Sequence, residues 1–282
     1  MCSSDTPGLA AALARRFQDG ARDVPAGLVS NPVLAGIAAR GSCRHFTPDP
    51  VPLAVLETLA AVALSAPSKS DLQQRDILIV DDPDLMAALK ALLAAQAWIA
   101  AAPALVVFCA NNQRQRLIHD WRGRHFANDH LDAFFNASVD AGIALATFVT
   151  AAESAGLGTC PISTIRNEAT AVSDLLALPD HVFPVAGLAV GYPLHPSPRI
   201  SMRLPLGQTI HRNRHSEAGL RKAVEAYDRA RDAAQPYGQQ RATEVFGTAD
   251  YYPWSEEKTR QYALPERADF GAFIRRRGFN LD

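Results

Sequence analysis

The sequence predicts an α+β fold, because short runs with the character of buried strands alternate with longer segments of helical periodicity. Residues 77–80 and 104–109 are apolar and rich in β-branched side chains, and residues 186–193 form a third, small-residue-rich run. A chain of 282 residues is long enough to bury a sizeable core. Its net charge of −1 excludes a broad basic surface of the kind that binds nucleic acid.

Helical periodicity indicates helices over residues 9–16, 32–39, 52–64, 85–101 and 168–176. The longest such segment, residues 134–155, has apolar side chains on most sides, and its only charges are Asp140 and Glu153. A helix of this kind must be buried on most sides. We therefore expect a central helix, or one that packs against a second copy of the chain. Gly156 should end it in the left-handed conformation.

Several classes of protein are disfavoured by what the chain lacks. No apolar run reaches the ~18 residues of a membrane-spanning helix, and residues 1–20 contain no signal-peptide hydrophobic region. The four cysteines are widely separated, which indicates neither a disulfide framework nor a zinc site. The spacing of His119, His125 and His130 does not suit metal ligands on one helix face, so no metal is predicted. We expect a cytoplasmic protein with no membrane or nucleic-acid partner.

Two short polar runs precede apolar segments and carry the chemistry. The first is Gly41-Ser42-Cys43-Arg44-His45-Phe46, and the second extends from Ser65 to Gln73 between a helix-like and a strand-like segment. Arginine and hydroxyl donors suit a phosphate, and an amide such as that of Gln73 suits the donor and acceptor edge of a flavin pyrimidine. Either run alone fits a plain loop or helix stop. Their order and spacing favour a site for flavin mononucleotide (FMN).

With these runs the chain resembles the FMN-dependent nitroreductase/flavin reductase family, whose members carry an Arg-Ser-x-Arg motif and then Ala-Pro-Ser-x-x-Asn-x-Gln. The resemblance covers about residues 30–210 and is carried further by residues 96–103, 151–167 and 184–205. It implies a nitroreductase-like central antiparallel or mixed sheet flanked by helices, in a homodimer whose flavin sites lie across the interface. It also implies a helical arm over residues 1–30, an FMN-binding domain over 31–210, and an extension over 211–282 that wraps the dimer and borders the active site.

The resemblance also implies the roles of individual residues. Arg40 and Arg203 are expected at the FMN phosphate and Arg44 nearer the pyrimidine edge, while residues 161–165 lie over one face of the ring near N5. No side chain is expected to act as an acid or nucleophile, because the flavin supplies the chemistry. The full set of predicted FMN contacts is Arg40, Gly41, Ser42, Arg44, Pro67, Ser68, Ser70, Gln73, Gln96, Pro161, Ile162, Ser163, Thr164 and Arg203.

The chain departs from the family pattern at three places. Asp71 stands where the motif has Asn, Ser163-Thr164 where the long branch has Gly-Gly, and Ser201 where relatives often have a phosphate-binding lysine. Arg267 falls where the branch with a long C-terminal extension places an arginine that faces the nicotinamide and the substrate. The alternative for that segment is a surface helix packed by Phe270, Phe273 and Ile274.

The implied activity is an enzyme that passes two electrons from NADPH or NADH through flavin N5 to nitroaromatics, quinones or flavins. Two alternatives stay open: a flavin-binding sensor or storage protein, and a specialised flavin dehydrogenase or flavin-destroying relative. The long branch selects NADPH with arginines shortly before a tryptophan of its extension. Residues 248–253, just before Trp254, contain no arginine, so we expect weak discrimination between the two donors.

Overall fold

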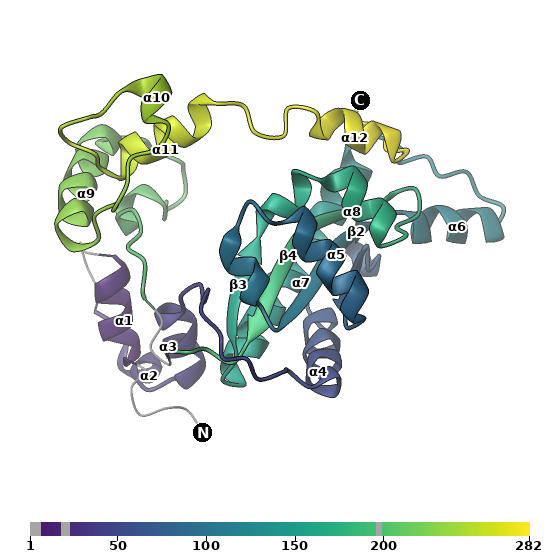
Figure 1. Cartoon of the computed structure of the whole chain (residues 1–282), viewed down its shortest axis with the longest axis horizontal. Coiled ribbons are helices and arrows are strands. Elements are labelled where there is room, and N and C mark those ends of the chain that lie inside the picture. The colour runs from purple at the N-terminus through teal and green to yellow at the C-terminus, as the bar shows by residue number, and fades with distance from the viewer. Residues whose placement is uncertain (1–6, 18–22, 196–198) are drawn as a thin grey trace. The chain divides into compact units, whose positions relative to one another are not determined.

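The computed structural model describes residues 7–17, 23–195 and 199–282 of the chain (Figure 1). These residues form two compact units. The first comprises residues 41–195 and 267–282, and the second comprises residues 7–17, 23–40 and 199–266.

The first unit is built on a four-stranded sheet of order β1-β2-β4-β3, in which every neighbouring pair is antiparallel. The strands are β1 (Arg75–Val80), β2 (Ala104–Asn111), β3 (Gly158–Ile162) and β4 (Val182–Gly191). The predicted α+β class with an antiparallel sheet is confirmed. Strand β3 was not predicted, and it includes Pro161 and Ile162, the first two residues of the segment that is expected to lie over the flavin.

Helices cover both faces of this sheet (Figure 1). Helices α4 (Leu53–Leu64) and α7 (Leu131–Ser154) pack on one face, and α5 (Pro83–Leu92) and α8 (Ala169–Leu175) pack on the other. Successive side chains of a strand point to opposite faces. Accordingly Val106 and Phe108 of β2 pack with α4 and α7, whereas Leu105 and Val107 pack with α5 and α8.

Helix α7 is the predicted central helix. It has the length and composition of a membrane span, so the prediction that no segment reaches that limit was wrong. Ala137, Ala141, Ala144 and Phe148 are nevertheless completely buried against the rest of the unit, which makes α7 a core helix. Gly156 follows it with φ +82°, in the predicted left-handed conformation.

The predicted helix over residues 85–101 is interrupted. Helix α5 ends at Leu92, and a short 3₁₀ helix, η2 (Ala97–Ala101), follows a turn. Lys90 donates its Nζ protons to the carbonyls of Ala100 and Ala102, at 3.1 and 2.7 Å, so the chain folds back before it enters β2. The polar segment 111–130 contains helix α6 (Gln113–Trp121).

The end of the chain returns to the first unit. Helix α12 (Phe270–Arg276) buries Phe273 and Ile274, and Phe279 follows it into the same cluster. This cluster also includes Phe183 of β4, whose ring centroid lies 5.3 Å from that of Phe279. The predicted packing of the last helix through its apolar residues is confirmed.

The second unit is helical among its described residues. It contains α1 (Leu9–Arg16), α2 (Ala26–Val29), α3 (Pro32–Ala39), η4 (Leu206–Gln208), α9 (Leu220–Ala234), α10 (Thr243–Phe246) and α11 (Trp254–Ala263). Within it the carboxylate of Glu257 accepts hydrogen bonds from the Tyr252 hydroxyl at 2.6 Å and from Arg241 Nη2 at 2.9 Å. Burial raises the pKa of Glu257, but these two donors outweigh it and hold the pKa below its usual value.

Candidate active site

The first polar run lies across the ends of strands β3 and β4. The Cys43 amide donates to the Thr159 carbonyl, and the Thr47 amide donates to the Tyr192 carbonyl, each at 2.8 Å. A bridge between Phe46 and residue 193 completes this alignment. The strand ends therefore fix the backbone of the run, and the side chains of Ser42 and Arg44 are exposed.

Glycines in the two strands make this close approach feasible. A Cβ atom at Gly191 would lie 2.4 Å from Cγ of Pro103 and 2.8 Å from Cδ1 of Phe46. A Cβ atom at Gly158 would lie 2.7 Å from both Cβ and Sγ of Cys43. Glycine is thus needed for packing at positions 158 and 191, because only a residue without a Cβ atom leaves room for the polar run.

Cys43 stands inside the first run but is not a nucleophile. Burial raises the pKa of its thiol, and the Sγ atom lies 3.2 Å from the His45 carbonyl, to which it donates. A protonated thiol has little nucleophilic character. The position therefore serves to pack the run against the sheet.

Arg44 and Gln96, two predicted FMN contacts, are brought together by Trp98. The Arg44 guanidinium lies 5.7 Å from the centroid of the Trp98 ring, a cation–π contact. The indole N–H of Trp98 donates to Gln96 Oε1 at 3.1 Å. Because an indole N–H can only donate, the amide atom facing it must be the oxygen. The Gln96 amide nitrogen is thereby left available to donate to a ligand.

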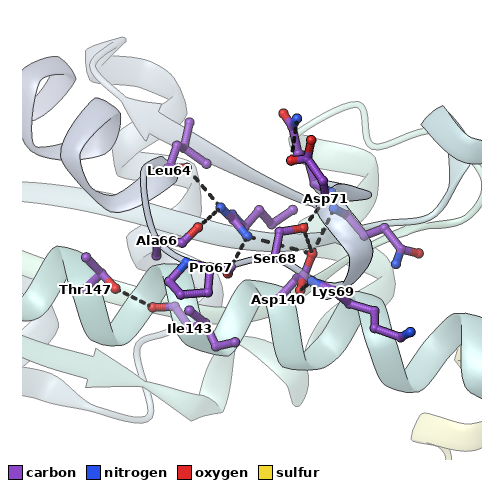
Figure 2. Close-up of polar contacts among 12 residues, drawn as sticks. Leu64, Ala66, Pro67, Ser68, Lys69, Asp71, Asp140, Ile143 and Thr147 are labelled. Carbon is purple, nitrogen blue, oxygen red and sulfur yellow. Dashed lines mark hydrogen bonds and ion pairs between the residues drawn. The ribbon is translucent and has the colours of Figure 1, made fainter.

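The second polar run forms a tight loop between α4 and β1 (Figure 2). Its backbone has three residues other than glycine in the left-handed region, Ser70, Asp71 and Gln73, with φ of 49°, 56° and 53°. Such a conformation costs about 1–3 kcal/mol per residue unless the surroundings impose it. Within the loop the Gln73 amide donates to Ser68 Oγ at 2.7 Å, and Gln73 Nε2 donates to Asp71 Oδ1 at 3.2 Å.

A buried ion pair lies beneath this loop. Arg75 Nη1 and Asp140 Oδ2 are 3.8 Å apart, with side-chain exposures of 2% and 0%. Figure 2 shows Asp140 of α7 directed at Ser68 and Lys69. The guanidinium of Arg75 donates to the carbonyls of Leu64, Ala66 and Pro67. Sequence reasoning assigned neither residue to the site. The available signal was Asp140, a lone charge in the middle of an apolar helix.

The segment predicted to face flavin N5 is the end of β3 and the following 3₁₀ helix η3 (Ser163–Arg166). The side chains of Pro161 and Ser163 are exposed, and that of Ile162 is buried. Thr164 Oγ1 is buried and has no hydrogen-bond partner in the part of the chain that the structure describes. Arg267, with φ 54°, donates from Nη1 to Asn167 Oδ1 at 2.9 Å, so it lies just beyond this segment.

The two arginines predicted at the phosphate belong to the second unit, where Arg16 connects them. The buried Arg16 guanidinium donates from Nε to the Ala38 carbonyl at 3.0 Å, and its Nη atoms donate to the carbonyls of Arg40 and Ser201. The amide of Arg203 donates in turn to the Arg16 carbonyl at 2.8 Å. The backbones at Arg40 and Arg203 are thus both tied to one residue of α1.

The donors present suit a flavin nucleotide. The predicted contacts supply a guanidinium at Arg44, an oriented amide at Gln96, a second amide at Gln73 and an unpaired hydroxyl at Thr164. An isoalloxazine presents carbonyl and ring-nitrogen acceptors to groups of these types. In the second unit, Arg40 and Arg203 carry guanidinium groups, which are the kind of donor that suits a phosphate.

Comparison with known proteins decides the family. The model of the nitroreductase family matches residues 37–192, and that of its C-terminal domain matches residues 201–282. The chain belongs to the nitroreductase family. It is 34% identical to the FMN reductase [NAD(P)H] of Bacillus subtilis, over 70% of this chain and 80% of that protein. It is 36% identical to the oxygen-insensitive NADPH nitroreductase of Salmonella typhimurium, over 66% of this chain and 75% of that protein.

Solved structures agree with this assignment along most of the chain. The structure of NfrA2 from B. megaterium is similar with a TM-score of 0.80 and 31% identity, over 89% of this chain and 99% of that one. The NADPH:FMN oxidoreductase of Vibrio harveyi, complexed with NAD+, is similar with a TM-score of 0.75 and 29% identity, over 88% and 98% of the two chains. As a member of the nitroreductase family, the protein is an oxidoreductase, and the prediction of an enzyme is confirmed.

Proposed function

We propose that this nitroreductase-family protein binds FMN and passes two electrons from NADPH or NADH to nitroaromatics, quinones or flavins. Bound FMN would supply the redox chemistry by accepting and giving hydride at N5. The relatives support this assignment through their names, since the Bacillus protein is an FMN reductase [NAD(P)H] and the Salmonella protein an NADPH nitroreductase.

The observation that carries the proposal is the arrangement of Arg44 and Gln96 on one indole ring. Trp98 holds a cation and an amide donor on one exposed part of the first unit. A cation near the pyrimidine edge stabilises the negative charge that a flavin gains on reduction. Arg44 would therefore stabilise the reduced state without transferring a proton itself.

The remaining predicted contacts take complementary roles. Arg40 and Arg203 would pair with the phosphate, and Gln73 would face the pyrimidine edge. The end of β3 and the start of η3 would face flavin N5. The hydroxyl of Thr164, which has no hydrogen-bond partner among the described residues, could form a hydrogen bond there. We propose that Arg267 contacts the nicotinamide or the substrate, because its bond to Asn167 places it next to η3.

A homodimer fits the exposed side of α7. Leu131, Phe135 and Val139 follow one another at intervals of four residues and are 50%, 59% and 41% exposed. Residues at this spacing share one helix face, and such a continuous apolar stripe is typical of a subunit interface. Phe135→Lys should therefore shift the protein from dimer to monomer in analytical ultracentrifugation, whereas Trp121→Lys on exposed α6 should not.

Three measurements on the purified protein test the proposal. Heat release followed by mass spectrometry should identify FMN, and finding FAD or no flavin would refute the cofactor. Addition of NADPH or NADH under argon should bleach the flavin absorbance. A bound flavin that neither donor reduces would instead favour a sensor or storage protein. Turnover with nitroarenes, quinones and free flavin then identifies the acceptor class.

A further inference from the structure

The loop of residues 68–74 has a conformation that its own sequence does not favour. Ser70, Asp71 and Gln73 all occupy the left-handed region, where residues other than glycine are uncommon. The loop contains no glycine, and the side chains of Ser70, Asp71 and Gln73 are exposed. Something beneath it must therefore impose this shape, because the exposed side chains do not bury the loop.

Asp140 supplies one half of that support. Its Oδ1 accepts from the Lys69 amide at 3.0 Å, and its Oδ2 accepts from Ser68 Oγ at 2.8 Å and from the Gln74 amide at 3.1 Å. These donors come from both ends of the loop. One carboxylate on the rigid helix α7 thus fixes the distance between the two ends (Figure 2).

Arg75 supplies the other half. Its Nη1 donates to the Pro67 carbonyl at 2.9 Å, and its Nη2 donates to the carbonyls of Leu64 and Ala66 at 2.9 and 2.6 Å. The carboxylate therefore takes N–H groups and the guanidinium takes C=O groups of the same connection between α4 and β1. The two side chains also compensate each other's charge in a fully buried position.

We propose that Asp140 and Arg75 are positioning residues that hold this loop, with Ser68, Ser70 and Gln73, in its FMN-binding shape before the flavin arrives. The inference rests on the proposed FMN site and explains how the site is ordered. Pre-organisation favours binding because the loop does not have to be ordered when the ligand arrives. Asn cannot replace Asp140, since its amide nitrogen would face an N–H donor where the carboxylate has an acceptor.

Hydrogen exchange of the flavin-free wild type tests the pre-formed shape directly. The amides of Lys69, Gln73 and Gln74 should be protected without FMN, because each donates to an acceptor within the protein. The comparison is the amide of Ser70, an exposed residue of the same loop. Protection of all three that appears only after FMN is added would overturn the proposal, because the flavin would then order the loop.

Variants separate positioning from general stability. In FMN titrations of the apoprotein, Asp140→Asn should raise the Kd roughly 10- to 100-fold. The double variant Asp140→Asn/Arg75→Gln contains no unpaired buried charge, so its melting temperature should recover relative to that of Asp140→Asn. Its FMN affinity should stay low, because the loop still lacks its acceptors. The matched control is Asp132→Asn on the exposed first turn of α7, which should bind FMN like the wild type.

The outcomes are distinct. A folded double variant whose Kd for FMN lies within twofold of wild type would refute the positioning role and leave the proposed function intact. Recovery of affinity and melting temperature together would likewise show that the pair only stabilises the fold. A wild-type protein that binds no FMN would refute the proposed function, and with it this inference. Low affinity in a thermally recovered double variant, with wild-type affinity in Asp132→Asn, supports it.

Discussion

Trp98 offers a direct test of how the candidate site presents its donors. Trp98→Phe keeps an aromatic ring beneath Arg44 but removes the indole N–H that holds the Gln96 amide. A neutral hydrogen bond of this kind contributes about 0.5–1.5 kcal/mol. If its whole effect is to orient the amide toward the flavin, the Kd for FMN should rise roughly 2- to 13-fold. Trp98→Leu also removes the cation–π contact, about 0.5–1 kcal/mol, for a combined rise of roughly 5- to 70-fold.

The assay is a fluorescence titration of the apoprotein with FMN, because free FMN is fluorescent and binding changes that signal. Trp121→Phe is the matched control, since this side chain is 74% exposed and should leave the affinity unchanged. Two graded losses at position 98 would support both contacts. Wild-type affinity in folded Trp98→Phe would refute the argument that the indole orients Gln96. Equal affinity in Trp98→Phe and Trp98→Leu would refute a contribution of the cation–π contact to FMN binding.

Three further predictions follow from contacts elsewhere. Gly191→Ala should lower the free energy of unfolding by about 1–3 kcal/mol, because the added Cβ atom would overlap Pro103. Thermal melts measure this loss. Gly36→Ala is the control, because a Cβ atom at position 36 would meet open space. The pKa of Glu257 is lowered in the folded protein, so this carboxylate stabilises the fold above its usual pKa of 4.5, and the stabilisation is lost as the pH falls through the lowered pKa. Glu257→Gln should therefore flatten the dependence of the melting temperature on acid pH. An unchanged slope would contradict this expectation. The kcat/KM values for NADPH and NADH should differ by no more than about tenfold, or ~1.4 kcal/mol, and a preference for NADPH above about a hundredfold would overturn this expectation. Arg267→Ala should lower kcat/KM for NADPH and for NADH to the same extent.

Much of the fold could be predicted because burial imposes regular patterns. The spacing of apolar residues located α1, α3, α4, α7 and β2, since one face or every face of these elements is buried. Strand β3 could not be predicted from the sequence, because Gly158 and Pro161 have low strand propensity. The strand lies at the edge of the sheet, where a missing proline N–H costs no ladder hydrogen bond. The break between α5 and η2 could not be predicted, because the alanine-rich sequence there contains no residue that signals the end of a helix before Pro103.

The candidate site could be predicted only in part. The polar runs around Arg44 and Gln73 could be located because their order and spacing along the chain favour a flavin site, although either run alone fits a plain loop. Whether they reach one flavin stays a prediction. Trp98 was missed because an aromatic residue beside an alanine-rich turn normally indicates core packing. Its N–H bond to Gln96 depends on the turn at η2, which the sequence did not predict.

The supports of the site have one physical property in common, which explains why sequence patterns did not show them. Arg16, Arg75 and Asp140 are all buried, and the bonds described here join each of them mainly to backbone groups of segments that carry predicted flavin contacts. Segments that present side chains to a ligand leave their own N–H and C=O groups outside helices and strands, and these groups still need partners when buried. A guanidinium carries five donors and a carboxylate about four acceptor positions, so one charged side chain can satisfy a whole turn. The charge is thus retained for its bonding capacity toward the backbone, and its sequence signal is only its isolation, as with Asp140 inside an otherwise apolar stretch of α7.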